Sequence, residues 1–172
     1  MTLSLKVFEP LVSLLHLVDG DVKPSLAWLY GEMLKAKTKI KEAFGNNAHA
    51  YRETIAIVDK KLKGRLDTPL HTTAYLLNPY YSYSGKTIFD DPSINEAFME
   101  CAEQFYNGDE KALTEMVNNE FTKFEHKDGP FKKKLAECCE NADYNPGKIL
   151  AAACCCYCCE LLLVVAVCCL LL

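Results

Sequence analysis

Apolar side chains at helical spacing most constrain what this chain can fold into. Between residues 48 and 63 they recur at Tyr51, Ile55, Val58 and Leu62, at intervals of four, three and four. This spacing places side chains on one face of an α-helix. No stretch alternates apolar and polar residues as a half-buried β-strand would. The sequence therefore predicts an all-α fold.

Proline, glycine, asparagine and aspartate mark where the expected helices begin and end. In chain order, these helices run over 10–18, 24–44, 48–63, 69–77, 92–105, 113–121 and 131–142. Residues 80–85 are predicted to form an aromatic, polar loop. We expect an irregular bundle of about six or seven helices with short connections, followed by a C-terminal hydrophobic helix.

The stretch from Asp59 to Tyr81 is the one around which we expect the chain to be organised. It ends one helix at Gly64, starts the next at Pro69 and stops it before Pro79, because the residue before a proline is driven out of helical geometry. Asp67 or Thr68 can cap the new helix. His71, just inside that helix, is predicted to be a packing or capping residue.

The charge balance argues against a dedicated nucleic-acid-binding protein but leaves a local basic surface open. The 172 residues carry 19 basic and 23 acidic side chains, a formal net charge of −4, whereas phosphate contacts need a basic face. The densest basic run is Lys60, Lys61, Lys63 and Arg65, followed by tyrosines 80, 81 and 83. These residues could contact DNA. A solvated helix end with a packed loop is the simpler interpretation.

The cysteines do not form a plausible disulfide framework. Seven of the ten lie between Cys154 and Cys169, whereas a secreted framework spreads its cysteines along the chain. We therefore expect a reduced, intracellular main domain. Cys155 and Cys158 have zinc-knuckle spacing, but no second pair stands at a matching distance. No metal or cofactor is expected.

The sequence shows no catalytic motif. Walker, dinucleotide-binding, nucleophile-elbow, zinc-protease and EF-hand patterns are absent. The paired acids Asp19 with Asp21, and Asp90 with Asp91, fall in turns, where carboxylates more often cap helices than bind metal. We expect no catalytic residue, no enzymatic activity and no small-molecule substrate.

The C-terminal residues 148–172 differ sharply from residues 1–147, which we take as the helical domain. From Ile149 to Leu172 the only charge is Glu160, and about 20 apolar residues suffice to span a bilayer. Aliphatic residues contribute about −3 to −7 kcal/mol to insertion, and the acid costs about 3 kcal/mol. One interpretation is a tail-anchored membrane protein. The other is translated intron or frameshifted sequence, which would leave a nuclear protein.

Several segments, in order, resemble plant hAT-superfamily transposases. They are Pro-Leu-Val at 10–12, Leu-Val-Asp-Gly-Asp-x-x-Pro at 17–24, Met-x-x-Ala-Lys at 33–37, the Tyr-to-Asp-Lys run at 51–60, Pro-Leu-His-x-x-Ala-Tyr-x-Leu-Asn-Pro at 69–79 and Ala-Asp-Tyr-Asn-Pro at 142–146. The likeness covers roughly residues 9–146. It implies the helical region of these RNase H-like enzymes, before their C-terminal dimerisation region.

The resemblance also implies which functions are missing. Such transposases carry three catalytic acids that bind divalent metal, on a core that this stretch does not include, so no catalytic residue transfers to any position here. The expected product is a truncated, transposase-derived protein without activity. Its expected partners are DNA or a transposase-like protein, or a membrane through the C-terminal segment.

Overall fold

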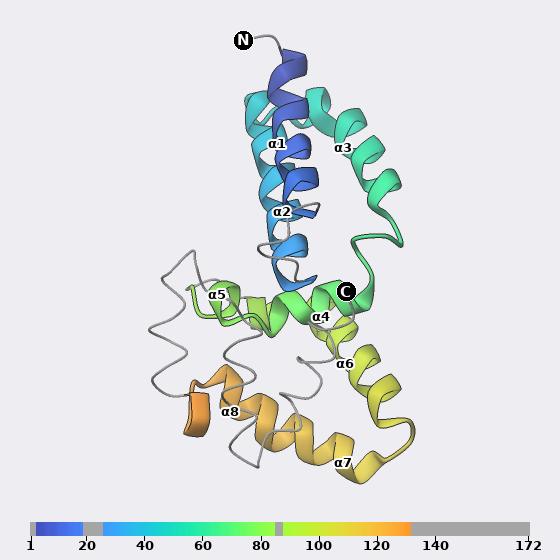
Figure 1. The fold of residues 1–172 in the computed structure, drawn as a ribbon, viewed down its shortest axis with the longest axis vertical. Coiled ribbons are helices and arrows are strands. Elements are labelled where there is room, and N and C mark those ends of the chain that lie inside the picture. Colours follow the sequence, from blue (N-terminus) through green and yellow to red (C-terminus); the bar gives the residue numbers. More distant parts are fainter. Residues whose placement is uncertain (1–2, 19–25, 85–87, 132–172) are drawn as a thin grey trace.

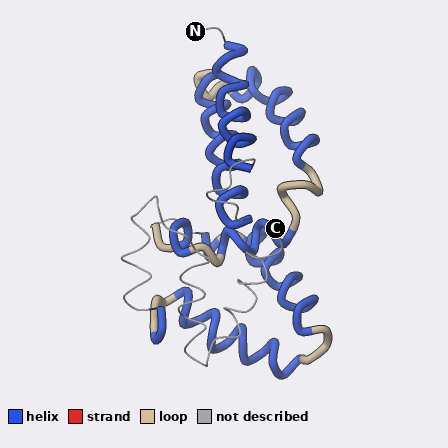
Figure 2. Tube along the Cα trace, viewed as in Figure 1, coloured by secondary structure: helices blue, strands red, loops and turns tan. Residues whose placement is uncertain are grey.

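A computed structural model describes residues 3–18, 26–84 and 88–131, and all regular structure in these ranges is helical (Figure 2). The all-α prediction is therefore confirmed for this part of the chain. The α-helices are α1 Leu3–Val18, α2 Leu26–Ala43, α3 Ala48–Leu62, α4 Pro69–Leu76, α5 Pro79–Ser82, α6 Pro92–Tyr106, α7 Glu110–Glu115 and α8 Thr122–Glu125. A π-helical segment, Met116–Phe121, joins α7 to α8. Short 3₁₀ turns cover Ile88–Asp90 and Gly129–Phe131.

The helices follow one another as a chain of packed neighbours along the long axis of the molecule (Figure 1). Helix α1 lies along α2, and α3 packs on α2 as well. Helix α4 crosses the lower end of α2 and packs on α6, which leads into the α7–α8 segment at the bottom of the view. Helix α4 therefore joins the upper three helices to the lower ones.

Helix α4 and the residues that follow it form the most buried stretch that the structure describes. Every residue from His71 to Pro79 is buried. The Thr73 hydroxyl donates a hydrogen bond to the Ala97 carbonyl of α6, at 3.2 Å. Because α2 and α6 cover it from two sides, this helix has no exposed polar face. Of the stretch Asp59–Tyr81 that the sequence singles out, residues 71–79 therefore lie at the centre of the fold, whereas its first part is largely exposed.

Two apolar clusters hold the described helices together. The larger one joins Trp28 of α2 to α4, α5, α6 and α8, and it includes Leu76, Phe98 and Phe124. The smaller one consists of Leu14, Leu29 and Met33, with Leu62 and Leu66 packed against it. The first cluster anchors α4, and the second positions the end of α3.

The expected start of the first helix at Pro10 is wrong. Helix α1 begins at Leu3 and carries Pro10 in its interior. The proline ring is buried against α2, so packing offsets the hydrogen bond that a proline removes from a helix. One turn further on, the Ser13 hydroxyl donates to the Glu9 carbonyl at 2.9 Å.

The prediction of a loop at residues 80–85 is also wrong for its first half, which belongs to α5, Pro79–Ser82. Asn78 caps the short helix α5 by accepting a hydrogen bond from the Tyr80 amide at 3.1 Å, with Pro79 at the first helical position. The same proline thus ends α4 and starts α5. Of the helix expected over 131–142, only Phe131 is described, at the end of a 3₁₀ turn. The boundary at 147 and the membrane segment Ile149–Leu172 lie outside the described residues.

Candidate nucleic-acid contact site

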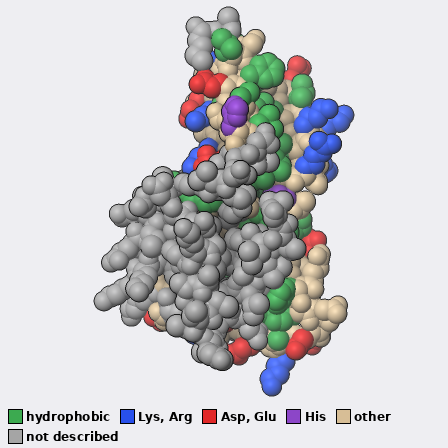
Figure 3. All heavy atoms as spheres, viewed as in Figure 1, with side chains coloured by type: hydrophobic (Ala, Val, Ile, Leu, Met, Phe, Trp, Pro, Cys, Tyr) green, Lys and Arg blue, Asp and Glu red, His purple; other side chains and the backbone are tan. Residues whose placement is uncertain are grey.

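The four basic residues singled out in the sequence occupy the end of α3 and the turn after it. Lys60 and Lys61 lie in the last turn of the helix, Lys63 is its C-cap, and Arg65 follows Gly64. All four side chains are exposed. Figure 3 shows basic side chains gathered over α3 on one face of the molecule. The four cations therefore lie within the last turn of α3 and the turn that follows it.

The local fold directs these cations outward. Leu62 and Leu66 pack against the smaller apolar cluster and fix the turn from within. Gly64 has a φ of +70°, a left-handed conformation that glycine adopts without strain. Its amide donates to the Asp67 carboxylate at 2.5 Å. With the leucines facing the core, Lys63 and Arg65 project into solvent.

Of the two nearest acids in the sequence, Asp59 is paired with another helix, whereas Asp67 lies in the basic turn itself. The Asp59 carboxylate pairs with the Lys37 ammonium of α2 at 2.7 Å, and Asp67 accepts from the Gly64 amide. Among the described residues, no ion pair involves Lys60, Lys61, Lys63 or Arg65. Their charges thus remain available to an anionic partner.

The tyrosines do not extend this basic surface. Tyr81 is buried against Trp28 and Tyr75, and its hydroxyl donates to the Glu32 carboxylate at 3.2 Å. Burial, together with the nearby Glu32 charge, raises the pKa of the Tyr81 phenol. The Tyr83 hydroxyl donates to the Phe124 carbonyl at 2.7 Å. The packed interpretation of this segment is therefore correct, and Tyr81 cannot stack on a base.

His71 is a packed residue at the start of α4. Its Nδ1 lies 2.7 Å from the Thr68 hydroxyl, and only 8% of the residue is exposed. Burial lowers the pKa of the imidazole, while the Asp67 charge raises it by less. The structure therefore gives His71 the packing role that the sequence predicts. Thr68 is the N-cap of α4, but its side chain makes no capping hydrogen bond to the helix backbone.

Asp91 acts as a helix cap, as expected for an acid in a turn. Its carboxylate accepts from the Ser93 amide at 3.0 Å and from the Ser93 hydroxyl at 2.6 Å. These hydrogen bonds lower the pKa of the carboxyl group. Asp19 and Asp21 lie outside the described residues.

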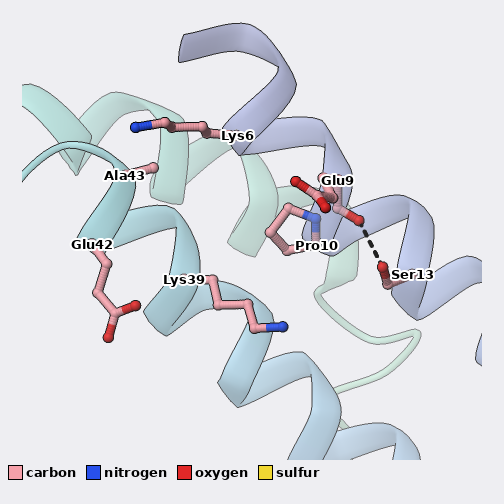
Figure 4. Close-up of a pocket in the computed structure, with 7 residues that line it drawn as sticks. All are labelled: Lys6, Glu9, Pro10, Ser13, Lys39, Glu42 and Ala43. Carbon is pink, nitrogen blue, oxygen red and sulfur yellow. Dashed lines mark hydrogen bonds between the residues drawn. The ribbon is translucent and has the colours of Figure 1, made fainter. Parts of the chain in front are cut away.

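A surface cleft of about 420 Å³ lies between α1 and α2. Figure 4 shows its lining: Lys6, Glu9, Pro10 and Ser13 from α1, and Lys39, Glu42 and Ala43 from α2. Charges of both signs line it, so it selects no single ligand charge. The sequence could not predict this cleft, because its two walls lie about thirty positions apart and meet only through helix packing.

Two features are absent from the described part of the chain. No group of three or more histidine, cysteine or acidic side chains there is arranged to hold a metal ion. No described helix is long and apolar enough to cross a membrane. Cys101 is half-buried, and burial raises the pKa of its thiol.

Comparison with protein-family models, with curated proteins and with solved structures finds no match for this chain. The likeness to hAT transposases therefore continues to depend on the sequence segments quoted above.

Proposed function

We propose that this chain is a non-enzymatic, hAT-transposase-derived domain that contacts the nucleic-acid backbone through Lys60, Lys61, Lys63 and Arg65. One observation carries the proposal. Four exposed cations fall within six residues at the end of α3, while the adjacent Asp59 pairs with Lys37 of α2. The sequence resemblance supports the class of protein, and the charge arrangement supports the contact.

The chemistry of this surface suits phosphates rather than bases. Exposed lysine and arginine side chains neutralise phosphate charge and release counterions, without reading sequence. The buried Tyr81 cannot serve as a stacking platform beside them. Because the chain carries a net charge of −4, we expect weak, salt-dependent and sequence-independent binding, with Kd of about 10⁻⁴ to 10⁻⁶ M.

The test is fluorescence anisotropy of a labelled DNA duplex titrated with the full chain at low salt. Changing all four residues to glutamine should lower the affinity at least about tenfold. The control variant changes Lys6, Lys39, Arg52 and Lys111, four exposed cations spread over α1, α2, α3 and α7, and has the same net charge. An equal loss of affinity in both variants would mean that net charge alone determines binding, and would overturn the assigned surface.

The absence of enzymatic activity is also part of the proposal. The resemblance provides no catalytic acid at any position, and phosphodiester cleavage by this class of enzyme needs acids that hold metal ions. We expect no cleavage of plasmid or duplex DNA by the purified chain with Mg²⁺ or Mn²⁺. Metal-dependent cleavage that co-elutes with the chain and is lost on changing one of its acids would contradict this.

The apolar segment Ile149–Leu172 supports a second candidate, a tail-anchored membrane protein with the helical domain in the cytosol. Its single charge is Glu160. With the cost of this acid included, the free energy of membrane insertion is roughly 0 to −4 kcal/mol. Alkaline extraction of membranes from expressing cells tests it. A tail-anchored chain stays in the membrane pellet, whereas a chain released into the supernatant is not an integral membrane protein.

A further inference from the structure

Helix α1 has apolar side chains on two of its faces, and α2 covers only one of them. Pro10 and Leu14 are buried on the side of α2. The other face carries Leu5, Phe8, Val12 and Leu15, which we call the α1 stripe; their exposed fractions are 56%, 61%, 45% and 60%. An apolar face of a helix normally packs against another element. The α1 stripe therefore lacks cover from the described helices.

Charged side chains of α1 do not interrupt the stripe. At 100° per residue, Lys6, Glu9, Ser13 and His16 fall together on the remaining side of the helix. The first three line the cleft between α1 and α2 (Figure 4). The stripe is thus a continuous apolar surface with a polar border on one side.

The area of the stripe fits a helix-to-helix contact. With about 150–250 Å² for a large apolar side chain, the four exposed fractions amount to roughly 330–560 Å², which is the size of the largest apolar patches on monomeric proteins. Two such stripes facing each other would bury roughly 700–1,100 Å², which reaches the ~1,000 Å² of the smallest specific interfaces at its upper end.

The order of the stripe makes it complementary to itself. Its residues are spaced three, four and three apart, a pattern that is the same in both chain directions. An antiparallel copy centred on Pro10 therefore places Phe8 opposite Val12 of the second copy, and Leu5 opposite Leu15 of the second copy. This is the isologous arrangement of a two-fold dimer, with the spacing of a coiled-coil seam.

We propose that the α1 stripe docks antiparallel on the α1 stripe of a second copy of this chain. The proposal is independent of the nucleic-acid contact, because the stripe lies on α1 and the four cations lie at the end of α3.

The test is sedimentation velocity of the full chain without DNA, in one non-ionic detergent for all samples. Wild type should be dimeric at micromolar concentration. Phe8→Glu and Val12→Lys should each yield monomers, whereas the double variant should restore the dimer, since the introduced acid faces the introduced base of the second copy. Ile57→Glu, on α3 and 63% exposed in the native residue, is the control and should stay dimeric.

Three results would overturn the proposal: a monomeric wild type, single variants that stay dimeric, or a double variant that stays monomeric. A monomeric wild type would mean that another part of this chain or a lipid surface covers the stripe. The melting temperature of wild type provides a second measurement that needs no variant to fold. It rises with protein concentration for a dimer and is constant for a monomer.

Discussion

Gly31 of α2 lies where the Tyr81 ring of α5 contacts the helix backbone. It lies in the interior of α2, where glycine is less favourable than alanine by about 1 kcal/mol. A Cβ at this position would overlap Cζ of the Tyr81 ring, and the Tyr81 hydroxyl lies 3.4 Å from the Trp28 carbonyl of the same helix. The glycine thus allows α5 to approach α2 closely. The sequence alone shows only a glycine in a helical pattern.

Gly31→Ala should destabilise the fold despite the better helix propensity of alanine. Overpacking in a close contact typically costs about 1–3 kcal/mol. We expect this loss in the free energy of unfolding measured by urea denaturation. The double variant with Tyr81→Ala should lose less than the sum of the two single variants, because the clash is then gone. Additive losses would place the cause outside the Gly31–Tyr81 contact.

His71 should make stability depend on pH. Burial lowers the pKa of the folded imidazole below its ordinary value of 6.5, so the unfolded chain binds the proton more readily. Stability is therefore full above pH 6.5 and falls as the pH drops through the lowered pKa of the folded state. His71→Gln should remove this part of the urea-midpoint profile, while His49→Gln, an exposed control, should keep it. Identical profiles for wild type and His71→Gln would contradict the assignment.

At the scale of helices, the sequence predicts helix ends well where a capping residue and a proline occur together. The helix expected over 92–105 is α6, Pro92–Tyr106, with Asp91 as its cap, and the one expected over 48–63 is α3, Ala48–Leu62. The prediction fails where one residue both ends a helix and starts the next, as Pro79 does between α4 and α5. The π-helical segment Met116–Phe121, whose last ring stacks on Phe98, has no signal in the spacing.

Asp91→Ala should weaken α6 by removing its N-terminal cap. Loss of such a cap costs about 0.5–2 kcal/mol, and the hydrogen bonds to Ser93 are the ones lost. Urea denaturation measures the change. Asp90→Ala, at the adjacent exposed acid outside α6, serves as the control and should change stability by less than about 0.5 kcal/mol. A larger effect at Asp90 than at Asp91 would contradict the capping role.

At the scale of the whole molecule, spacing predicts which residues share a helix face but not what that face meets. The all-helical class follows from local patterns, and the organising role expected for Asp59–Tyr81 holds for its buried residues 71–79. The burial of Tyr81 against Trp28 joins residues 53 positions apart, and no local pattern encodes it. Likewise, the sequence shows a basic run at Lys60–Arg65, but only the structure shows that Asp59 pairs with Lys37.

The most direct test of phosphate binding by the basic run Lys60–Arg65 is the salt dependence of DNA affinity. Each phosphate contact contributes about 0.9 to the slope of log K against log salt. Changing Lys60, Lys61, Lys63 and Arg65 to glutamine should therefore flatten the wild-type slope by up to about 3–4, while the dispersed control variant keeps it. Equal slopes for wild type and the fourfold variant would contradict the claim.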